Sequence, residues 1–213
     1  PNGINLPKTT KKYVKPDSNY HLLYLGRLHP KKGIDILLQA IATLKKENPN
    51  IFNNWIIDIV GWDHENCQTK LEHIVHSNNL KEIVILHGGL FGEDKIKMYA
   101  NPDAYILPSH GEGLPMTILE AWSWKLPVVM TPQCNIPEGF EANAAIRIED
   151  NVSSIKQGLQ TLFNMSDEER ISMGNRGYKL VSENFTWDAS AQKMIMLYKW
   201  LTNQGEKPDF VYE

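Results

Sequence analysis

The sequence predicts an α/β protein with a three-layer, doubly wound parallel sheet of the Rossmann-like kind. Short, almost continuously apolar runs alternate along the chain with longer segments whose apolar residues recur at helical spacing. Runs of that composition are typical of strands buried on both faces of a parallel sheet. Repeated alternation of strand and helix places helices on both faces of one such sheet.

The overall composition is that of an ordinary globular protein. The chain has 213 residues and is most simply one domain; its apolar fraction of 42% and charged fraction of 22% argue against global disorder. A formal net charge of -3 argues against a nucleic-acid partner, because such proteins are usually basic. Cys67 and Cys134 form no close-spaced thiol pair, and we find neither a signal peptide nor an apolar stretch that could span a bilayer. We therefore expect a reducing, cytoplasmic location.

Six apolar runs are expected to form the strands of the sheet. The first of them, from His21 to Gly26, shows the common pattern, a short buried segment that ends in glycine. The six lie at about residues 21–26, 55–60, 83–86, 104–107, 127–130 and 145–148.

Segments with helical periodicity separate and follow these strands. In a short helix between the third and fourth strands we expect Ile96 and Tyr99 to face inward. Ser166 and Glu169 supply a capping box for a later helix, and the chain from Pro208 onward is expected to be a loose tail. The expected helices cover about residues 33–47, 65–78, 93–100, 115 onward, 153–164, 166–184 and 187–202.

The stretch from Ile106 to Ala121 joins a strand, a glycine-bearing turn and a helix that begins with Pro115 near its first position. Such a turn suits a phosphate, because free N–H groups converge there and the helix dipole favours negative charge. Glu112 lies at the mouth of the turn and Glu120 inside the helix, on the order of 10 Å apart along the axis at ~1.5 Å per residue. That separation is about the span from the sugar to the ribose of a nucleotide sugar, so the stretch predicts a nucleotide-sugar site.

Further candidate residues follow the other strand ends. Arg27 and Lys32 bracket the turn after the first strand, and glycine-bearing loops begin at Gly61 and His87. Because the carboxyl ends of parallel strands share one edge of the sheet, we expect these loops to converge with the turn that contains Glu112. Arg27 and Lys32 could there neutralise a diphosphate, Arg27 through a bidentate contact.

Each candidate also has a plainer interpretation. Arg27 and Lys32 could be solvated surface cations, and Glu120 an exposed helix residue. Apolar neighbours nevertheless favour partial burial of Glu120, and a buried carboxylate needs donors, which ribose hydroxyls would supply. Glu112 could merely interact with the helix N-terminus. Glu112→Asp would then be silent, whereas a binding role predicts damage.

With these residues in place, the chain resembles the C-terminal, donor-binding half of glycosyltransferase family 4 (group 1), the retaining enzymes with the two-domain GT-B fold. The resemblance covers nearly the whole chain. The motifs that carry it are Pro1-Asn2-Gly3-Ile4-Asn5, Gly26-Arg27-Leu28 with Lys32-Gly33, Pro108-Ser109 with Glu112-Gly113-Leu114-Pro115 and Leu119-Glu120-Ala121, and Pro127-Val128-Val129. The departures from the family pattern are Asn5 in place of Asp, Leu114-Pro115 in place of the commoner Phe-Gly, and Trp62-Asp63 where a small residue is frequent.

The resemblance implies a role for each matching residue. Arg27 and Lys32 would bind the donor diphosphate and stabilise the departing nucleotide, Glu112 would contact the transferred sugar as a catalytic residue, and Glu120 would hold the ribose. The loop at Leu86-His87-Gly88 would lie against the base. The donor would be a nucleotide sugar such as a UDP- or GDP-sugar. Neither a metal nor another cofactor is expected, because the cations and the helix N-terminus supply the charge stabilisation. The residues implied to line the donor site are Gly26, Arg27, Lys32, His87, Gly88, Glu112, Gly113, Leu114, Met116, Thr117 and Glu120.

The resemblance also implies that an acceptor-binding N-terminal half is missing from this chain. It divides the chain into a residual interdomain linker (1–19), a nucleotide-sugar-binding domain (20–186), a helix that crosses to the absent half (187–204) and a tail (205–213). Several of Trp187, Tyr198 and Trp200 should then be exposed here.

The implied activity is sugar transfer to a sugar or lipid-linked acceptor in the synthesis of a polysaccharide, lipopolysaccharide or glycolipid. It would take place at the inner face of a membrane, with peripheral association through the absent half. By itself the chain would bind its donor but turn over poorly or not at all. Two alternatives stay open: a sugar-nucleotide epimerase or phosphorylase of related fold, and a nucleotide-binding module without catalysis.

Overall fold

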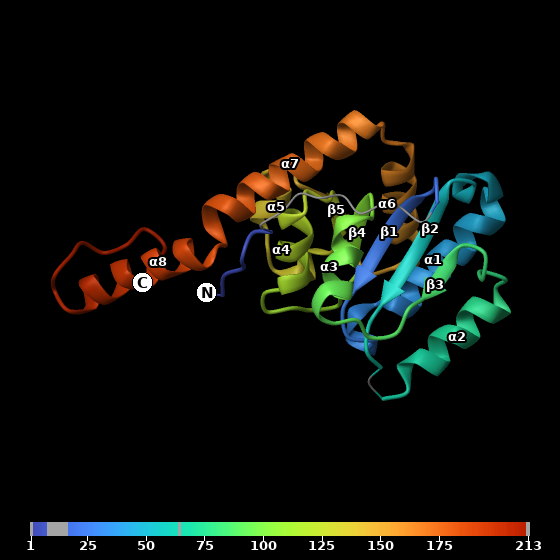
Figure 1. The fold of residues 1–213 in the computed structure, drawn as a ribbon, viewed down its shortest axis with the longest axis horizontal. Helices are drawn as coiled ribbons and strands as arrows, with labels where there is room; N and C mark the ends of the chain where they lie inside the picture. Colours follow the sequence, from blue (N-terminus) through green and yellow to red (C-terminus); the bar gives the residue numbers. More distant parts are fainter. Residues whose placement is uncertain (1, 8–16, 64, 212–213) are drawn as a thin grey trace.

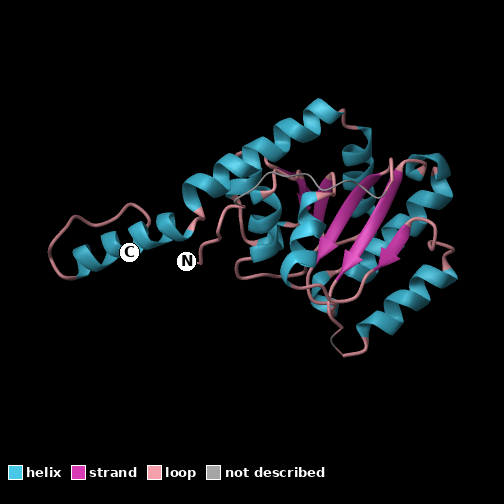
Figure 2. Ribbon diagram, viewed as in Figure 1, coloured by secondary structure: helices cyan, strands magenta, loops and turns pink. Residues whose placement is uncertain are grey.

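One parallel sheet forms the centre of the structure, a computed structural model that describes residues 2–7, 17–63 and 65–211. Within those residues the strands follow the order β3-β2-β1-β4-β5-β6, and every neighbouring pair is parallel. Figure 2 shows the strands as one sheet with helices around it. Their bounds are β1 (Tyr20–Leu25), β2 (Trp55–Val60), β3 (Val84–Leu86), β4 (Ala104–Leu107), β5 (Val128–Met130) and β6 (Ala145–Arg147). From β1 the chain adds β2 and β3 on one side and then returns to add β4, β5 and β6 on the other side. The order of the strands therefore reverses between β1 and β4.

Helices cover both faces of this sheet (Figure 1). Their bounds are α1 (Ile34–Glu47), α2 (Cys67–Ser77), α3 (Gly92–Ala100), α4 (Met116–Ser123), α5 (Glu138–Glu141), α6 (Val152–Asn164), α7 (Asp167–Asn184) and α8 (Trp187–Leu201). On one face α1 packs against α2 and α6, and on the other α4 packs against α7. Hydrogen bonds join α3 to α4 on that second face. The predicted three-layer, doubly wound architecture is confirmed.

The predicted elements are all present, with ends that differ by no more than two residues. The capping box of Ser166 and Glu169 is formed at the start of α7. Periodicity did not predict α5 or the short 3-10 turns at 30–32, 49–52 and 132–134, because each is about one turn long. The expectation that Ile96 faces inward is wrong: Ile96 is 45% exposed, and only Tyr99 of the pair is buried. Ile85 of β3, a strand at the edge of the sheet, is also 42% exposed, so the helices cover this edge of the sheet incompletely.

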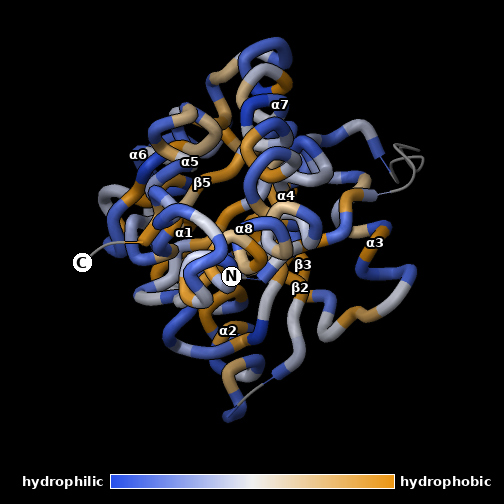
Figure 3. Tube along the Cα trace, turned by 90° about the vertical axis from the view of Figure 1, so that its left-hand side faces the viewer, coloured by the Kyte–Doolittle hydropathy of each residue, from blue (hydrophilic) through white to orange (hydrophobic). Residues whose placement is uncertain are grey.

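The core lies between the sheet and its two helix layers. Hydrophobic residues are concentrated along the strands in the middle of the molecule (Figure 3). Trp122 of α4 is completely buried, and its indole N–H donates to the carbonyl oxygen of Ala144 at 3.1 Å. Both cysteines, Cys67 and Cys134, are buried and unbonded to each other, and burial raises the pKa of the Cys134 thiol to about 11.

The last helix, α8, projects from the body of the domain, and the tail folds back along it (Figure 1). We call α8 and the tail to Val211 the arm. Trp187 and Tyr198 are 51% and 58% exposed, as expected, whereas Trp200 is half-buried. An apolar groove of about 560 Å³ separates α8 from the end of α7; Leu180, Phe185, Met194, Leu197 and Phe210 are among the residues that line it. The tail is less loose than expected, because Pro208 is buried and Phe210 lines the groove.

The start of the described chain packs against the junction between α7 and α8. The backbone N–H of Ile4 donates to the carbonyl oxygen of Phe185 at 2.8 Å, and Ile4 forms a parallel bridge with Thr186. Pro1 and residues 8–16 of the predicted linker lie outside the described residues, and the proposed division into 1–19, 20–186, 187–204 and 205–213 stays a prediction. Among the helices of the described chain, none combines the length and apolar character needed to cross a membrane.

Candidate functional site

The candidate site lies at the carboxyl edge of the sheet, where the loops after β1 and β4 meet. Ligands bind at this position in doubly wound sheets, because the connections leave the two neighbouring strands in opposite directions and open a crevice. The loops are joined by hydrogen bonds from the N–H of His110 and the hydroxyl of Ser109 to the carbonyl oxygen of Lys31, at 2.8 and 3.0 Å. Gly33 has φ +68°, and a Cβ there would lie 2.1 Å from the carbonyl oxygen of Pro108. Only glycine therefore allows this close approach.

Lys32 and Glu112 form an ion pair across these two loops. The Nζ atom of Lys32 lies 2.6 Å from Oε1 of Glu112, and the side chains are only 18% and 12% exposed. The hydroxyl of buried Ser109 donates to the same carboxylate oxygen at 2.6 Å. The two residues assigned to the diphosphate and to the sugar are thus brought together into one electroneutral pair. Ser109 was quoted in the sequence motif, but its bond to Glu112 was not foreseen.

Arg27 is the more accessible cation. Its side chain is exposed and its guanidinium carbon lies 5.8 Å from the ring centroid of Trp62, within the range of a cation–π contact. The hydroxyl of Tyr24 donates to the carbonyl oxygen of Arg27 at 2.9 Å, which fixes the backbone of this turn. Trp62 is itself 47% exposed. The sequence marked Trp62 as a departure from the family pattern but did not connect it with Arg27.

The loops after β2 and β3 pack against this turn. A Cβ on Gly61 would lie 2.0 Å from the carbonyl oxygen of Gly26, and the N–H of Gly61 donates to the carbonyl oxygen of Gly88 at 2.8 Å. A Cβ on Gly89 would lie 2.9 Å from Cβ of Trp62. Three strand-end loops are therefore in direct contact, as the argument from a shared edge predicts.

The N-terminus of α4 faces the same edge. The predicted helix begins one residue later than expected, because Pro115 immediately precedes it and the first helical residue is Met116. The N–H groups of Met116 and Thr117 belong to the first turn and so have no acceptor within the helix. The preceding turn is braced from the loop after β5: the N–H of Glu112 donates to the carbonyl oxygen of Gln133 at 2.8 Å, and Asn135 donates to that of Gly113 at 3.0 Å. These contacts hold the turn beside the helix N-terminus.

Glu120 lies in the second turn of α4 and is bonded to α3. Its carboxylate accepts from Nζ of Lys95 at 2.6 Å and from the hydroxyl of Tyr99 at 2.8 Å. Burial raises the pKa of Tyr99 well above its ordinary value, so this phenol is a permanent donor. The carboxylate therefore already has protein donors and does not need ribose hydroxyls for that purpose, although 29% of its side chain is exposed. Sequence reasoning did not identify Lys95; its i, i+4 spacing to Tyr99 was the available signal.

His87 begins the loop after β3, and its ring is directed into the sheet. Its Nε2 atom lies 2.6 Å from Oδ1 of Asp58, and 29% of its side chain is exposed. The other carboxylate oxygen of Asp58 lies 2.6 Å from Nδ1 of His21. Asp58 and His21 were not predicted as site residues. For metals, the described residues contain no group of three or more His, Cys, Asp or Glu side chains arranged to hold an ion.

Comparison with known proteins connects this geometry to a family. The family model described as glycosyl transferases group 1 matches residues 7–180. This chain belongs to the group 1 glycosyl transferases. Among curated relatives, it is 22% identical to the capsular polysaccharide biosynthesis glycosyltransferase CapM of Staphylococcus aureus, over 96% of this chain and 54% of that protein. The chain spans about half the length of the curated relatives it matches.

Solved structures show the fold that this chain shares. The C-terminal domain of the group 1 protein LpcC from Francisella tularensis matches with a TM-score of 0.68 and 23% identity, over 79% of this chain and 87% of that one. Sucrose-phosphate synthase from Thermosynechococcus elongatus matches with a TM-score of 0.76 and 22% identity, over 95% of this chain and 52% of that one. The fold is therefore that of the C-terminal domain of a GT-B glycosyltransferase. The roles of the individual site residues stay predictions.

Proposed function

We propose that this domain is the donor-binding half of a retaining glycosyltransferase that uses a nucleotide sugar. The observation that supports this most directly is the meeting of Lys32, Glu112 and the α4 N-terminus at the β1/β4 reversal. A diphosphate bound there would contact Arg27, Lys32 and the N–H groups of the first turn of α4. Charge-assisted contacts of this kind contribute about 1.5–3 kcal/mol each.

The proposed chemistry follows from where charge develops. When the bond between the anomeric carbon and the diphosphate oxygen breaks, its electron pair stays on the diphosphate. Arg27, Lys32 and the helix N-terminus would stabilise that growing negative charge without a metal. Glu112 would face the positively charged sugar, and its bonds to Lys32 and Ser109 hold its carboxylate in place for this role. Glu120, held by Lys95 and Tyr99, would meet the ribose.

The acceptor site belongs, in this proposal, to an N-terminal domain outside the chain. Two features support this: the chain spans about half of its relatives, and the arm exposes large apolar side chains. Trp187, Ile195, Met196, Tyr198 and Leu201 are each at least 44% exposed on α8. We propose that α8 packs on that domain. The similarity to CapM, a capsular polysaccharide biosynthesis glycosyltransferase, favours a capsule-type polysaccharide as the product. We propose that the transfer takes place on the cytoplasmic side of a membrane.

Thermal-shift measurements with UDP, GDP, ADP and their sugars test the donor proposal. A ligand present at 100 times its Kd stabilises the folded state by about 2.7 kcal/mol, so one base should give a clear rise in Tm. No shift with any of these nucleotides would contradict the proposal. Joining the chain to an N-terminal domain and assaying sugar transfer distinguishes a catalytic half from a module that binds nucleotide without catalysis.

A further inference from the structure

Asp58 is a buried carboxylate in the middle of the sheet, and the proposed chemistry does not use it. It is 5% exposed, and each of its two oxygens lies 2.6 Å from a histidine nitrogen, one from His21 and one from His87. A second carboxylate, on Asp17, lies 3.2 Å from the other nitrogen of His21. Burying an ionised group is costly, and well-packed apolar residues at such a position are often as stable. The sheet alone therefore gives no reason for an aspartate here.

The register of the sheet explains how these three residues meet. His21 pairs with Ile56 and Leu23 pairs with Asp58, so His21 and Asp58 point to the same face of adjacent parallel strands. This is the face covered by α3, since Leu23 also pairs with Tyr105, whose ring lies 6.3 Å from that of Tyr99. His87 reaches the same carboxylate from the end of β3, with its backbone N–H bonded to the carbonyl oxygen of Ile59 at 3.0 Å.

Asp58 is held ionised by its neighbours. Burial acts to raise its pKa, but hydrogen bonds from His21 and His87 outweigh burial and hold the pKa below its ordinary value. The hydrogen bond to Asp58 in turn raises the pKa of His21. An ionised carboxylate only accepts hydrogen bonds, so the nitrogen of His87 that faces it must carry the proton. Nδ1 of His87, on the other side of the ring, is then an acceptor whenever the ring is neutral.

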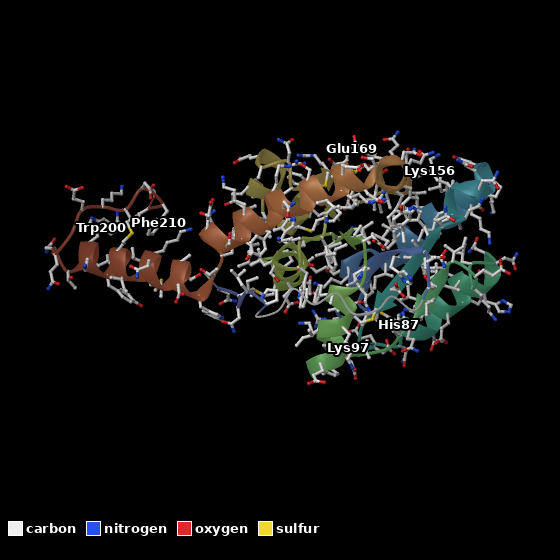
Figure 4. All side chains as sticks on the ribbon, turned by 45° about the horizontal axis from the view of Figure 1, so that its top comes forward. His87, Lys97, Lys156, Glu169, Trp200 and Phe210 are labelled. Atoms are coloured by element: carbon white, nitrogen blue, oxygen red, sulfur yellow. The ribbon has the colours of Figure 1, made fainter. Side chains whose placement is uncertain are left out.

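The hydrogen bond between Asp58 and His87 also affects the loop that begins at His87 and runs to Phe91. Gly88 and Gly89 of this loop contact Gly61 and Trp62, and Trp62 lies beside Arg27. His87 is in the body of the domain, far from Trp200 and Phe210 of the arm (Figure 4). A residue that fixes the His87 ring therefore fixes the loop that borders the anion site on the side away from Glu112.

We propose that Asp58, supported by His21, is a positioning residue for the nucleoside part of the donor. The resemblance to the family already implies that the loop at Leu86-His87-Gly88 lies against the base. The new inference is that Asp58 holds the His87 ring so that Nδ1 faces that base, while the phosphates bind at Arg27, Lys32 and the α4 N-terminus. This inference rests on the proposed nucleotide-sugar site. It separates the site into a base half, which depends on Asp58, and a phosphate half, which does not.

Calorimetric titration of the chain with UDP, GDP, ADP and inorganic pyrophosphate tests this separation. In Asp58→Val and His87→Ala we expect the favoured nucleoside diphosphate to bind about tenfold more weakly, the equivalent of one hydrogen bond. Pyrophosphate should bind as in the wild type, to within about twofold by the same arithmetic. Asp58→Asn keeps an acceptor for His87 and should recover part of the loss. Glu47→Gln, which removes a carboxylate from an exposed ion pair with Lys156, is the matched control and should change neither affinity.

Ring-nitrogen NMR of His87 adds a readout that a general loss of stability would not produce. The wild type should show the tautomer protonated at Nε2, and Asp58→Val should show a mixture. If Asp58→Val does not fold, Asp58→Asn and His87→Ala still decide the question. Unchanged nucleoside diphosphate binding in the variants, or equal weakening of pyrophosphate binding, would overturn the role assigned to Asp58 and leave the proposed function untouched. A wild-type chain that binds neither nucleotide nor pyrophosphate would overturn the proposed function, and this inference with it.

Discussion

The ion pair of Lys32 and Glu112 makes the sharpest prediction, because it can be tested without any ligand. Lys32→Met leaves the charge of Glu112, whose side chain is 12% exposed, without its partner. Glu112→Gln leaves the charge of Lys32, whose side chain is 18% exposed, without its partner. Breaking a buried pair in this way costs about 3–5 kcal/mol. Since Ser109 continues to bond to the carboxylate, we expect the lower end for Lys32→Met, about 3 kcal/mol of unfolding free energy. For a chain of this length that is a fall in Tm of roughly 6–12 °C.

The double variant should be much less destabilised than the sum of the two single variants. Neither charge then stays unpaired, so we expect a coupling energy of about 1.5–3 kcal/mol. Urea denaturation, with the m-value checked for constancy, measures all four free energies. The exposed pair of Glu47 and Lys156, at 2.7 Å, is the matched control, with expected coupling of at most about 1 kcal/mol. Additivity of the Lys32 and Glu112 variants to within about 0.5 kcal/mol would refute the reasoning.

Three further predictions follow from the site. Gly33→Ala should lower the unfolding free energy by at least about 1–2 kcal/mol in urea denaturation, because of its left-handed φ of +68°; an unchanged midpoint would contradict this. The folded pKa of Asp58 is lowered, so its stabilising effect is present above its ordinary pKa of 3.8. The folded pKa of His21 is raised, so its stabilising effect is complete below its ordinary pKa of 6.5 and is lost as the pH rises through the raised folded value. The stability difference between wild type and Asp58→Asn should therefore be greatest between these two pH values, and a difference independent of pH would argue against the pair. Trp62→Ala should weaken nucleoside diphosphate binding about two- to fivefold by calorimetry through loss of its contact with Arg27, whereas Trp62→Phe should retain most of the affinity; equal affinities would remove Trp62 from the site.

The secondary structure and the position of the site could be predicted because they depend on local pattern and on general rules of chain topology. Apolar runs such as Leu22 to Leu25 indicate buried strands without knowledge of their neighbours. Strand ends of a parallel sheet must share an edge, so Arg27, His87 and Glu112 could be placed on one side of the molecule. The error at Ile96 has the same origin: periodicity identifies a helical face but not how much of that face the sheet covers.

The pairing of charges could not be predicted, and it decides what each site residue is able to do. Glu120 was expected to seek donors in a ligand, but Lys95 and Tyr99 reach it from another helix. Asp58 interrupts an apolar run, and the sequence does not reveal its hydrogen-bond partners; the structure shows that they are His21 and His87.

From the sequence alone came the strand–helix order, the shared edge and the resemblance to the donor half of a group 1 glycosyl transferase. The tertiary structure alone decided that Lys32 neutralises Glu112, that Trp62 lies beside Arg27 and that Asp58 joins two histidines. The physical reason is that periodicity acts between neighbours in sequence, and the topology of a parallel sheet places strand ends at one edge without fixing which side chains there meet. A hydrogen bond of 2.6 Å between residues 80 positions apart depends instead on strand register and on how two loops pack.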